Sequence, residues 1–307
     1  MERVNQRPTR FLVAMLFVAT WNVNGLPATE PNQLLTHDGK QKFAPVFVNG
    51  GQAIVYSVLE RAQRVVLKRL DLTDGSQHLV LPEGNASQFD VDFSSDGRLL
   101  CYAKSDFDRQ LKLVILDIKS QREFIFSPAG TSRSTVRTPR FLPGTAGVIF
   151  TVNGSGGQQI VAVDLEAKNP KELTTSNGAN GWPAVSPDGQ KIVFSSSRKG
   201  VFNLYIMDRD GSNLRRLTEG MASDLHASWS PDGNRIAFTS TRAGNYEVYL
   251  INADGTNLRR FTNHPERDDF AIWHPDGRRM LTIAERGGRF DLHLTEIGEP
   301  RSANENR

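Results

Sequence analysis

Apolar and polar residues alternate in short runs along the chain, and this period-two pattern predicts β-strands. Within residues 181–220, the turn SPDG is followed by the alternating run KIVFSSS, and the polar loop RKG by a second run, NLYIMD. A further turn, RDGSN, leads to LRRLT. Proline presets φ, aspartate can hydrogen-bond the backbone further along, and glycine accepts positive φ, so both turns suit tight hairpins. The segment therefore predicts four strands joined by two tight turns and one longer loop.

The same segment recurs at a step of 44 residues in the second half of the chain, where Pro187, Pro231 and Pro275 are in register. Weaker copies precede it, in FAPVFVNGGQAIVYSV, QFDVDFSSDGRLLCYAK and TPRFLPGTAGVIFTV. The first strand of each copy ends at an apolar position, and these positions are Phe47, Phe93, Phe141, Val185, Trp229 and Trp273. Repeats of about 40 to 50 residues with several short strands are typical of β-propellers. We therefore predict an all-β, six-bladed β-propeller of four-stranded blades over residues 29–297.

The last copy lacks a fourth strand, because the polar tail GEPRSANENR follows FDLHLTEI. A matching segment lies near the N-terminus, where NQLLTHDG resembles NLRRLTEG and NLRRFTNH. Thr36 precedes Phe47 by 11 residues, as Thr218 precedes Trp229. We therefore predict that residues 31–36 supply the outer strand of the last blade, which would join the chain ends and remove an exposed sheet edge.

The first 28 residues have the pattern of a secretory signal peptide. Arg3, Arg7 and Arg10 precede the apolar run FLVAMLFVA, and small residues follow at Gly25 and Ala28. The run is shorter than the about 20 apolar residues that span a bilayer, so we expect cleavage after Ala28 and no membrane span. Residues 298–307 form a polar tail that we expect to be disordered. Together these features predict export across the inner membrane to the periplasm.

The net charge of the chain is +3, and it falls to +1 when the three Arg and one Glu of residues 1–28 are removed. A nearly neutral propeller gives no basis for a nucleic-acid partner, because phosphate binding requires a concentrated basic surface. Cys101 is the single cysteine, so an intrachain disulfide is impossible. Its place in an alternating run predicts that it packs inside a strand.

The turn SPDG with its alternating strand, followed by NLYIMDRDGSNLRRLT, resembles the Pro-Asp, WD-like propeller repeat of the TolB family. The resemblance covers residues 31–297 and is most specific in the last three copies. It implies a periplasmic propeller of the cell envelope that binds other proteins and does not catalyse a reaction. TolB itself carries an α/β domain ahead of its propeller, and we expect only the propeller portion here. Similar propellers occur in peptidases and in a pectin-fragment lyase, so the fold alone does not choose a function.

Functional sites on propellers gather where loops converge on the central channel. Five residues before the apolar position of each first strand lie Lys42, Gln88, Val136, Asn180, Asp224 and Asp268, and three residues before it lie Ala44, Asp90, Thr138, Trp182, His226 and Phe270. We therefore expect a partner-binding mouth near the last three blades, formed by Asn180, Trp182, Asp224, His226, Asp268, Asp269 and Phe270. Aromatic faces beside fixed polar groups suit a protein segment or a sugar. In the alternative interpretation, Trp182 and Phe270 plug the channel and the aspartates cap turns.

His226 is the histidine that this spacing brings to the mouth. Beside Asp224, it could act as a base or help to bind a divalent cation, and the prevalence of oxygen ligands makes calcium fit better than zinc. No second histidine stands at the equivalent loop position. The sequence therefore predicts no cofactor, with calcium the one metal left open.

Arg198, Arg242 and Arg286 also recur at the 44-residue step, in the loop between the second and third strands of a repeat. This loop should open on the same face as the channel mouth. The repetition fits either a basic arc that receives an acidic partner or a structural contact repeated within each blade.

The sequence contains no G-x-S-x-G elbow, no H-E-x-x-H helix and no phosphate-binding loop. It therefore favours a monomeric protein-binding scaffold of the cell envelope over an enzyme. The alternative is a saccharide-binding or saccharide-cleaving propeller that uses the channel mouth around His226.

Overall fold

A computed structural model describes residues 32–298, except 83, 106–109, 130–133, 145–146 and 155–156. The predicted signal peptide, residue 31 of the predicted closing strand and nearly all of the predicted tail lie outside the described residues. Within the described part of the chain, no helix is long and apolar enough to cross a membrane.

The regular secondary structure of the described residues consists of strands, apart from one short 3-10 helix, η1 (Asn49–Gly51). They make four separate four-stranded sheets. The first contains β2 (Lys42–Val48), β3 (Ala53–Arg61), β4 (Arg64–Asp71) and β5 (Gln77–Leu79). The second contains β14 (Asn180–Val185), β15 (Lys191–Ser196), β16 (Asn203–Asp208) and β17 (Arg215–Arg216), and the third β18 (Asp224–Trp229), β19 (Arg235–Ser240), β20 (Glu247–Asn252) and β21 (Arg259–Arg260). The fourth, which we call the last sheet, contains β22 (Asp268–Trp273), β23 (Arg279–Arg286), β24 (Arg289–Glu296) and β1 (Asn32–Leu34).

The remaining strands form one eight-stranded sheet, and this corrects the prediction of six separate four-stranded blades. Its members are β6 (Gln88–Phe93), β7 (Leu99–Ser105), β8 (Leu111–Asp117), β9 (Arg122–Phe126), β10 (Thr135–Phe141), β11 (Gly147–Gly154), β12 (Gly157–Asp164) and β13 (Lys171–Glu172). The join is a parallel pairing of β10 with β8, in which Thr135 lies opposite Leu111. Among the described residues, the structure thus has four separate four-stranded blades and one fused, double-sized sheet. The fusion occurs where the repeat is most degenerate, so the sequence pattern gave no warning of it.

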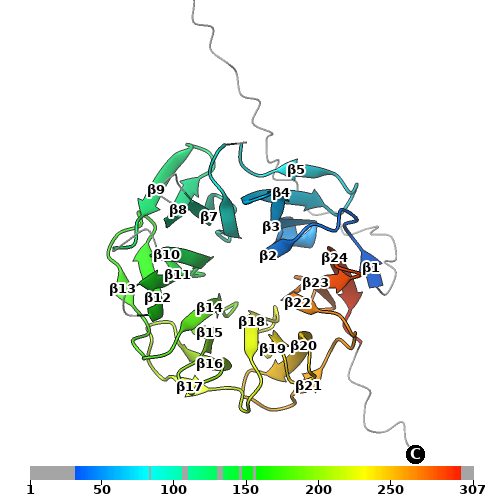
Figure 1. Ribbon diagram of the computed structural model, residues 1–307. Coiled ribbons are helices and arrows are strands. Elements are labelled where there is room, and N and C mark those ends of the chain that lie inside the picture. Colours follow the sequence, from blue (N-terminus) through cyan, green and yellow to red (C-terminus); the bar gives the residue numbers. More distant parts are fainter. Residues whose placement is uncertain are drawn as a thin grey trace, which may run out of the picture. The chain divides into compact units, whose positions relative to one another are not determined.

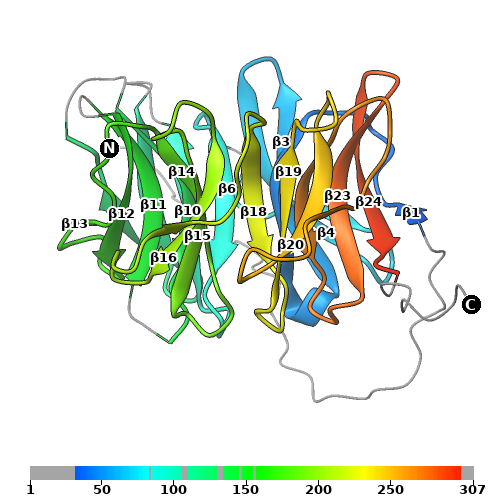
Figure 2. The same cartoon turned by 90° about the horizontal axis from the view of Figure 1, so that it is seen from below.

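The predicted closure by the N-terminal strand is confirmed, although β1 is shorter than residues 31–36. It pairs antiparallel with β24, with Asn32 opposite Thr295 and Leu34 opposite His293. Figure 2 shows β1 beside β24 at the edge of the last sheet. The buried Thr36 follows the strand, and its hydroxyl accepts a hydrogen bond from the Leu292 N–H at 3.0 Å.

Thr36 thereby repeats a contact that three other threonines make within their own sheets. The acceptor hydroxyls of Thr174, Thr218 and Thr262 lie 2.9 Å from the N–H groups of Ile160, Leu204 and Val248, respectively. The equal spacing in the sequence therefore reflects one hydrogen bond between the third and fourth strands of a sheet, which we call the latch. In the last sheet, the other end of the chain supplies it.

The first strand of each repeat lies nearest the centre in Figure 1. These inner strands contact one another in chain order, β2 with β6, β6 with β10, β10 with β14, β14 with β18 and β18 with β22, and β22 contacts β2. The apolar core lies between neighbouring sheets; for example, Ile54 and Tyr56 of the first sheet share a buried cluster with Leu281, Ile283 and Leu292 of the last. Burial between sheets stabilises such a ring because no sheet has a second apolar layer of its own.

The Pro-Asp-Gly segments form the predicted tight turns. In SPDG, the Asp188 carboxylate accepts hydrogen bonds from the Ser186 hydroxyl at 2.5 Å and from the Gln190 N–H at 3.0 Å. Gly189 has φ 70°, and a Cβ there would lie 2.6 Å from the carbonyl oxygen of Pro143. Glycine is required at this turn on both grounds.

Cys101 lies in β7 and is fully buried, which confirms the prediction that it packs inside a strand. Burial raises the pKa of its thiol well above the ordinary value. It is therefore a core side chain that holds its proton at neutral pH.

Candidate functional site

Every inner strand carries a β-bulge three residues before the repeat position occupied by Phe47, Phe93, Phe141, Val185, Trp229 and Trp273. In β18, for instance, the register shifts between Leu225 and Ser228. The residue at the bulge has positive φ in all six strands, at Ala44 (43°), Asp90 (55°), Thr138 (50°), Trp182 (52°), His226 (51°) and Phe270 (50°). A non-glycine residue in this region costs on the order of 1–3 kcal/mol, so the surrounding fold must hold it there. The six positions that the spacing singled out thus share one strained backbone geometry.

The bulges bring three of these side chains into contact, as the sequence predicts. The rings of His226 and Phe270 stack with their centroids 3.9 Å apart, and Trp182 meets His226 edge-on at 5.2 Å. Phe202, in the loop before β16, packs edge-on against Trp182 at 5.5 Å. Sequence reasoning missed Phe202, whose only signal was an apolar residue in a polar loop. Four aromatic rings from three sheets therefore form one continuous cluster, which we call the aromatic cluster.

His226 is held in place by the neighbouring inner strand. Its Nδ1 lies 2.7 Å from Oδ1 of Asp269, which also accepts a hydrogen bond from the Thr239 hydroxyl at 2.7 Å. The other carboxylate oxygen of Asp269 pairs with Arg267. Burial alone would raise the pKa of Asp269, but His226 and Arg267 outweigh it and hold that pKa well below its ordinary value. Asp269 therefore orients the His226 ring, and its own carboxylate is already occupied.

The three repeated arginines contact the polar residue five places before the inner-strand end of their own sheet. The nitrogen–oxygen distances are 2.8 Å for Arg198 to Asn180, 2.7 Å for Arg242 to Asp224 and 2.8 Å for Arg286 to Asp268. Arg198 and Arg242 also lie over aromatic rings of their sheets. These contacts match the structural interpretation of the repeat, and none of the six residues lines the central cavity. Of the ten residues proposed from sequence, Trp182, His226 and Phe270 line it.

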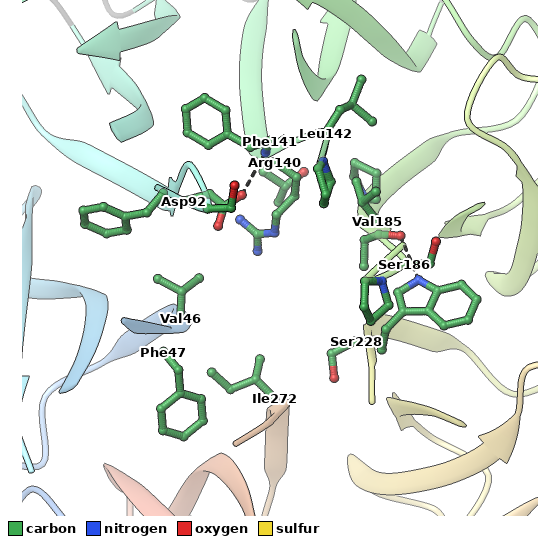
Figure 3. A pocket seen from close by; sticks show the side chains of 18 of the residues that line it. Val46, Phe47, Asp92, Arg140, Phe141, Leu142, Val185, Ser186, Ser228 and Ile272 are labelled. Atoms are coloured by element: carbon green, nitrogen blue, oxygen red, sulfur yellow. Dashed lines mark hydrogen bonds between the residues drawn. The ribbon is translucent and has the colours of Figure 1, made fainter. Parts of the chain in front are cut away.

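The inner strands surround a cavity of about 780 Å³. The aromatic residues Trp182, His226 and Phe270 line it, as do Pro187, Pro231 and Pro275 of the tight turns. Figure 3 shows Val46, Asp92, Arg140, Ser228 and Ile272 around the space, each from the position directly before the inner-strand end. The walls are therefore mostly apolar.

Asp92 and Arg140 give this cavity its charged side. Asp92 accepts a hydrogen bond from the Phe141 N–H at 2.8 Å, drawn in Figure 3, and burial raises the pKa of its carboxyl. Arg140 donates to the carbonyl oxygen of Pro139 at 2.8 Å. Sequence reasoning missed both residues. Their signal was a charge at a repeat position that otherwise carries Val46, Ala184, Ser228 and Ile272.

Among the residues that the structure describes, no group of three or more His, Cys, Asp or Glu side chains could hold a metal ion. Asp224, which the sequence placed beside His226, is fully buried and accepts two hydrogen bonds from Arg242. The partner of His226 is instead Asp269, on the neighbouring sheet.

Several solved structures share this fold. A TolB from Acinetobacter baumannii aligns with a TM-score of 0.66 at 22% identity, over 80% of this chain and 64% of that one. A protein of Agrobacterium tumefaciens assigned as TolB aligns with a TM-score of 0.62 at 21% identity, over 72% and 81% of the two chains. An oligogalacturonate lyase in complex with manganese aligns with a TM-score of 0.63 at 18% identity, over 86% and 79%. These identities establish a shared fold and nothing about activity.

No curated protein matches the sequence. The family model of the TolB beta propeller domain matches residues 52–201 and 175–303, which together span most of the chain. The tight turns, the inner-strand positions from Phe93 onward and the latch threonines 174, 218 and 262 all fall within these matches. The chain belongs to the TolB β-propeller domain family.

Proposed function

We propose that this protein is exported to the cell envelope and acts there as a scaffold that binds a segment of another protein in its central cavity. The observation that carries the proposal is the cavity of about 780 Å³ with Trp182, His226 and Phe270 of the aromatic cluster along its wall. Sites of roughly 300–1,000 Å³ with mostly apolar walls and a few fixed polar groups are typical of ligand binding. Aromatic-lined sites of this kind bind extended peptide segments in several protein families.

The polar groups give the bound segment an orientation. His226 is fixed by Asp269, and Arg140 and Asp92 stand on the wall supplied by the eight-stranded sheet. A segment with apolar side chains toward the aromatic cluster and a polar group toward Arg140 and Asp92 would fit both. The contacts that Arg198, Arg242 and Arg286 make within their own sheets then stabilise the loops that form the mouth.

The test is capture of envelope proteins by residues 29–307, followed by direct binding of the recovered protein. Trp182→Ala and Phe270→Ala, made singly and together, should weaken that binding at least tenfold, because buried aromatic anchors dominate such interfaces. Ser212→Ala, in an outer turn, is the matched control and should bind as the parent does. Equal binding by all of these variants would place the partner elsewhere on the molecule.

A second candidate is a saccharide-binding or saccharide-cleaving propeller. The fold shared with an oligogalacturonate lyase favours it, as does the hydrogen bond that fixes His226. Oligogalacturonates would be incubated with the protein with and without Mn²⁺, and their chain length followed by mass spectrometry. Shortening that is lost in His226→Gln would favour the saccharide-cleaving form of this candidate, and unchanged chains would remove that form.

A further inference from the structure

One core position of the repeat is occupied by a different kind of residue in the last sheet. Nine residues after the inner-strand end, five repeats place an aromatic residue that is at most 2% exposed, and these are Tyr56, Tyr102, Phe150, Phe194 and Phe238. The last repeat has Thr282 there. A threonine is much smaller than an aromatic ring, and cores are close-packed, so the change must be compensated or leave a space.

The cross-strand partner of this position changes as well. In the second and third sheets, Phe194 and Phe238 lie opposite Tyr205 and Tyr249, with ring centroids 6.0 Å apart in each pair. In the last sheet Thr282 lies opposite His293. The Phe–Tyr pair of the second and third sheets is therefore replaced in the last sheet by two smaller side chains, a threonine and a histidine.

A cavity of about 380 Å³ occupies this place. Thr282 and His293 line it from the last sheet, and Phe261 and His264 line it from the segment that follows β21. Asp268 and Arg286 add a carboxylate and a guanidinium to its wall. The volume lies near the lower end of the range for small-molecule sites, roughly 300–1,000 Å³.

The Asp268 carboxylate is under-satisfied in this cavity. The residue is 2% exposed, and its Oδ1 lies 2.8 Å from an Arg286 nitrogen but makes no hydrogen bond of good geometry to any described residue. Burial raises the pKa of Asp268, with Arg286 acting in the opposite direction. This oxygen has the charge of Arg286 nearby but no well-aligned hydrogen bond, so a bound donor would stabilise it further.

Arg286 is more available than its counterpart in the third sheet. Arg242 lies over the rings of Phe238 and Tyr249, and its side chain is 19% exposed. At the equivalent positions Arg286 has Thr282 and His293 instead of Phe and Tyr, and its side chain is 36% exposed. Asp268 and Arg286 neutralise each other, and Glu296 adds a further carboxylate to the lining, so the cavity disfavours an anionic ligand.

We propose that this cavity is a binding site for a small, uncharged, polyhydroxylated molecule of monosaccharide size. Each hydroxyl of such a ligand can both donate and accept, which suits a wall made of a carboxylate, a guanidinium, an imidazole and the Thr282 hydroxyl. Phe261 offers an apolar face to the ring carbons. The site is separate from the central cavity and does not depend on the protein-binding role.

The experiment measures binding of glucose, galactose, mannose, N-acetylglucosamine and myo-inositol to residues 29–307 by saturation-transfer NMR, with galacturonate as the charged comparison. At least one neutral compound should bind with a Kd below 10 mM, ~−2.7 kcal/mol by the usual relation, and galacturonate should bind more weakly than galactose. Failure of all five neutral compounds, or preferred binding of galacturonate over galactose, would overturn the proposal.

The decisive variant introduces the aromatic pair of the second and third sheets, as Thr282→Phe with His293→Tyr. It should fold, because the third sheet holds this pair at the same register, and it should weaken saccharide binding at least tenfold by filling the cavity. If circular dichroism shows that it does not fold, Thr282→Phe alone replaces it. Unchanged saccharide binding in a folded variant would refute the assignment. The double variant Trp182→Ala with Phe270→Ala, in the central cavity, should leave saccharide binding intact, which separates this site from the central one.

Discussion

Replacement of Thr36 by valine tests whether the ring closes in solution as it does in the structure. Thr36→Val keeps the shape of the side chain and removes the hydroxyl that accepts the Leu292 N–H and donates to Asp291 at 2.8 Å. Asp291 keeps Lys42 as a partner, but the Leu292 N–H is left buried without an acceptor. An unsatisfied buried backbone group costs about 1–3 kcal/mol, so we expect the free energy of unfolding to fall by that amount.

Thr218→Val is the matched variant within a single sheet, because it strands the Leu204 N–H in the same way. The two substitutions lie in different sheets and share no partner, so their costs should be similar and should add within about 0.5 kcal/mol in the double variant. Urea unfolding of residues 29–307 gives both values, provided that the slope m is unchanged.

A loss above about 1 kcal/mol for Thr218→Val together with no loss for Thr36→Val would refute the closure, since the N-terminal strand would then be detached in solution. A changed slope in Thr36→Val alone would mean that the variant opens before it unfolds. The unfolding rate should rise in Thr36→Val if the latch forms late in folding.

Three further predictions concern single side chains. Asp224→Ala should lower the free energy of unfolding by about 2–4 kcal/mol because it leaves Arg242 without its partner. Asp224→Asn should lower it by less than about 1 kcal/mol, since Asn180 accepts a hydrogen bond from the equivalent arginine at 2.8 Å. Equal losses for the two variants in thermal unfolding would contradict this. Cys101 should react with Ellman's reagent only after unfolding, and fast labelling of the native protein would be inconsistent with its burial. Folding lowers the pKa of Asp269, so the stability that this residue contributes is present above its unfolded pKa of about 4 and is lost as pH falls toward the folded value. Asp269→Asn should therefore reduce the slope of the free energy of unfolding against pH, below pH 4, by up to about 1.4 kcal/mol per pH unit. An unchanged slope would refute the pairing with His226.

The sequence predicts those parts of the fold whose residues recur at the same place in each repeat. The 44-residue step located the tight turns, and the spacing of Thr36 from Phe47 located the closing strand, because both depend on local geometry that the chain repeats. The parallel pairing of Leu111 with Thr135 was not predictable, since it is a contact between two degenerate repeats with no periodic signal.

The candidate site, too, was predictable from the sequence only in part. The convergence of Trp182, His226 and Phe270 followed from one shared position on neighbouring inner strands. The partner of His226 did not, because spacing along one strand suggested Asp224, whereas the bulge turns the ring toward Asp269 of the next sheet. Contacts between sheets depend on the twist and stagger of the blades, which a repeat pattern does not record.

The six bulges also have a consequence for how such a protein can change. The same left-handed backbone holds Ala44, Asp90, Thr138, Trp182, His226 and Phe270, so the geometry does not depend on which side chain stands there. Every residue except glycine meets backbone strain at such a position, with Asn and Asp least affected and β-branched residues most, so an exchange that alters the lining of the cavity leaves the backbone conformation in place. All of these residues except Asp90 line the central cavity, so the ring offers five positions at which selection or design could change the binding specificity without rebuilding the blades.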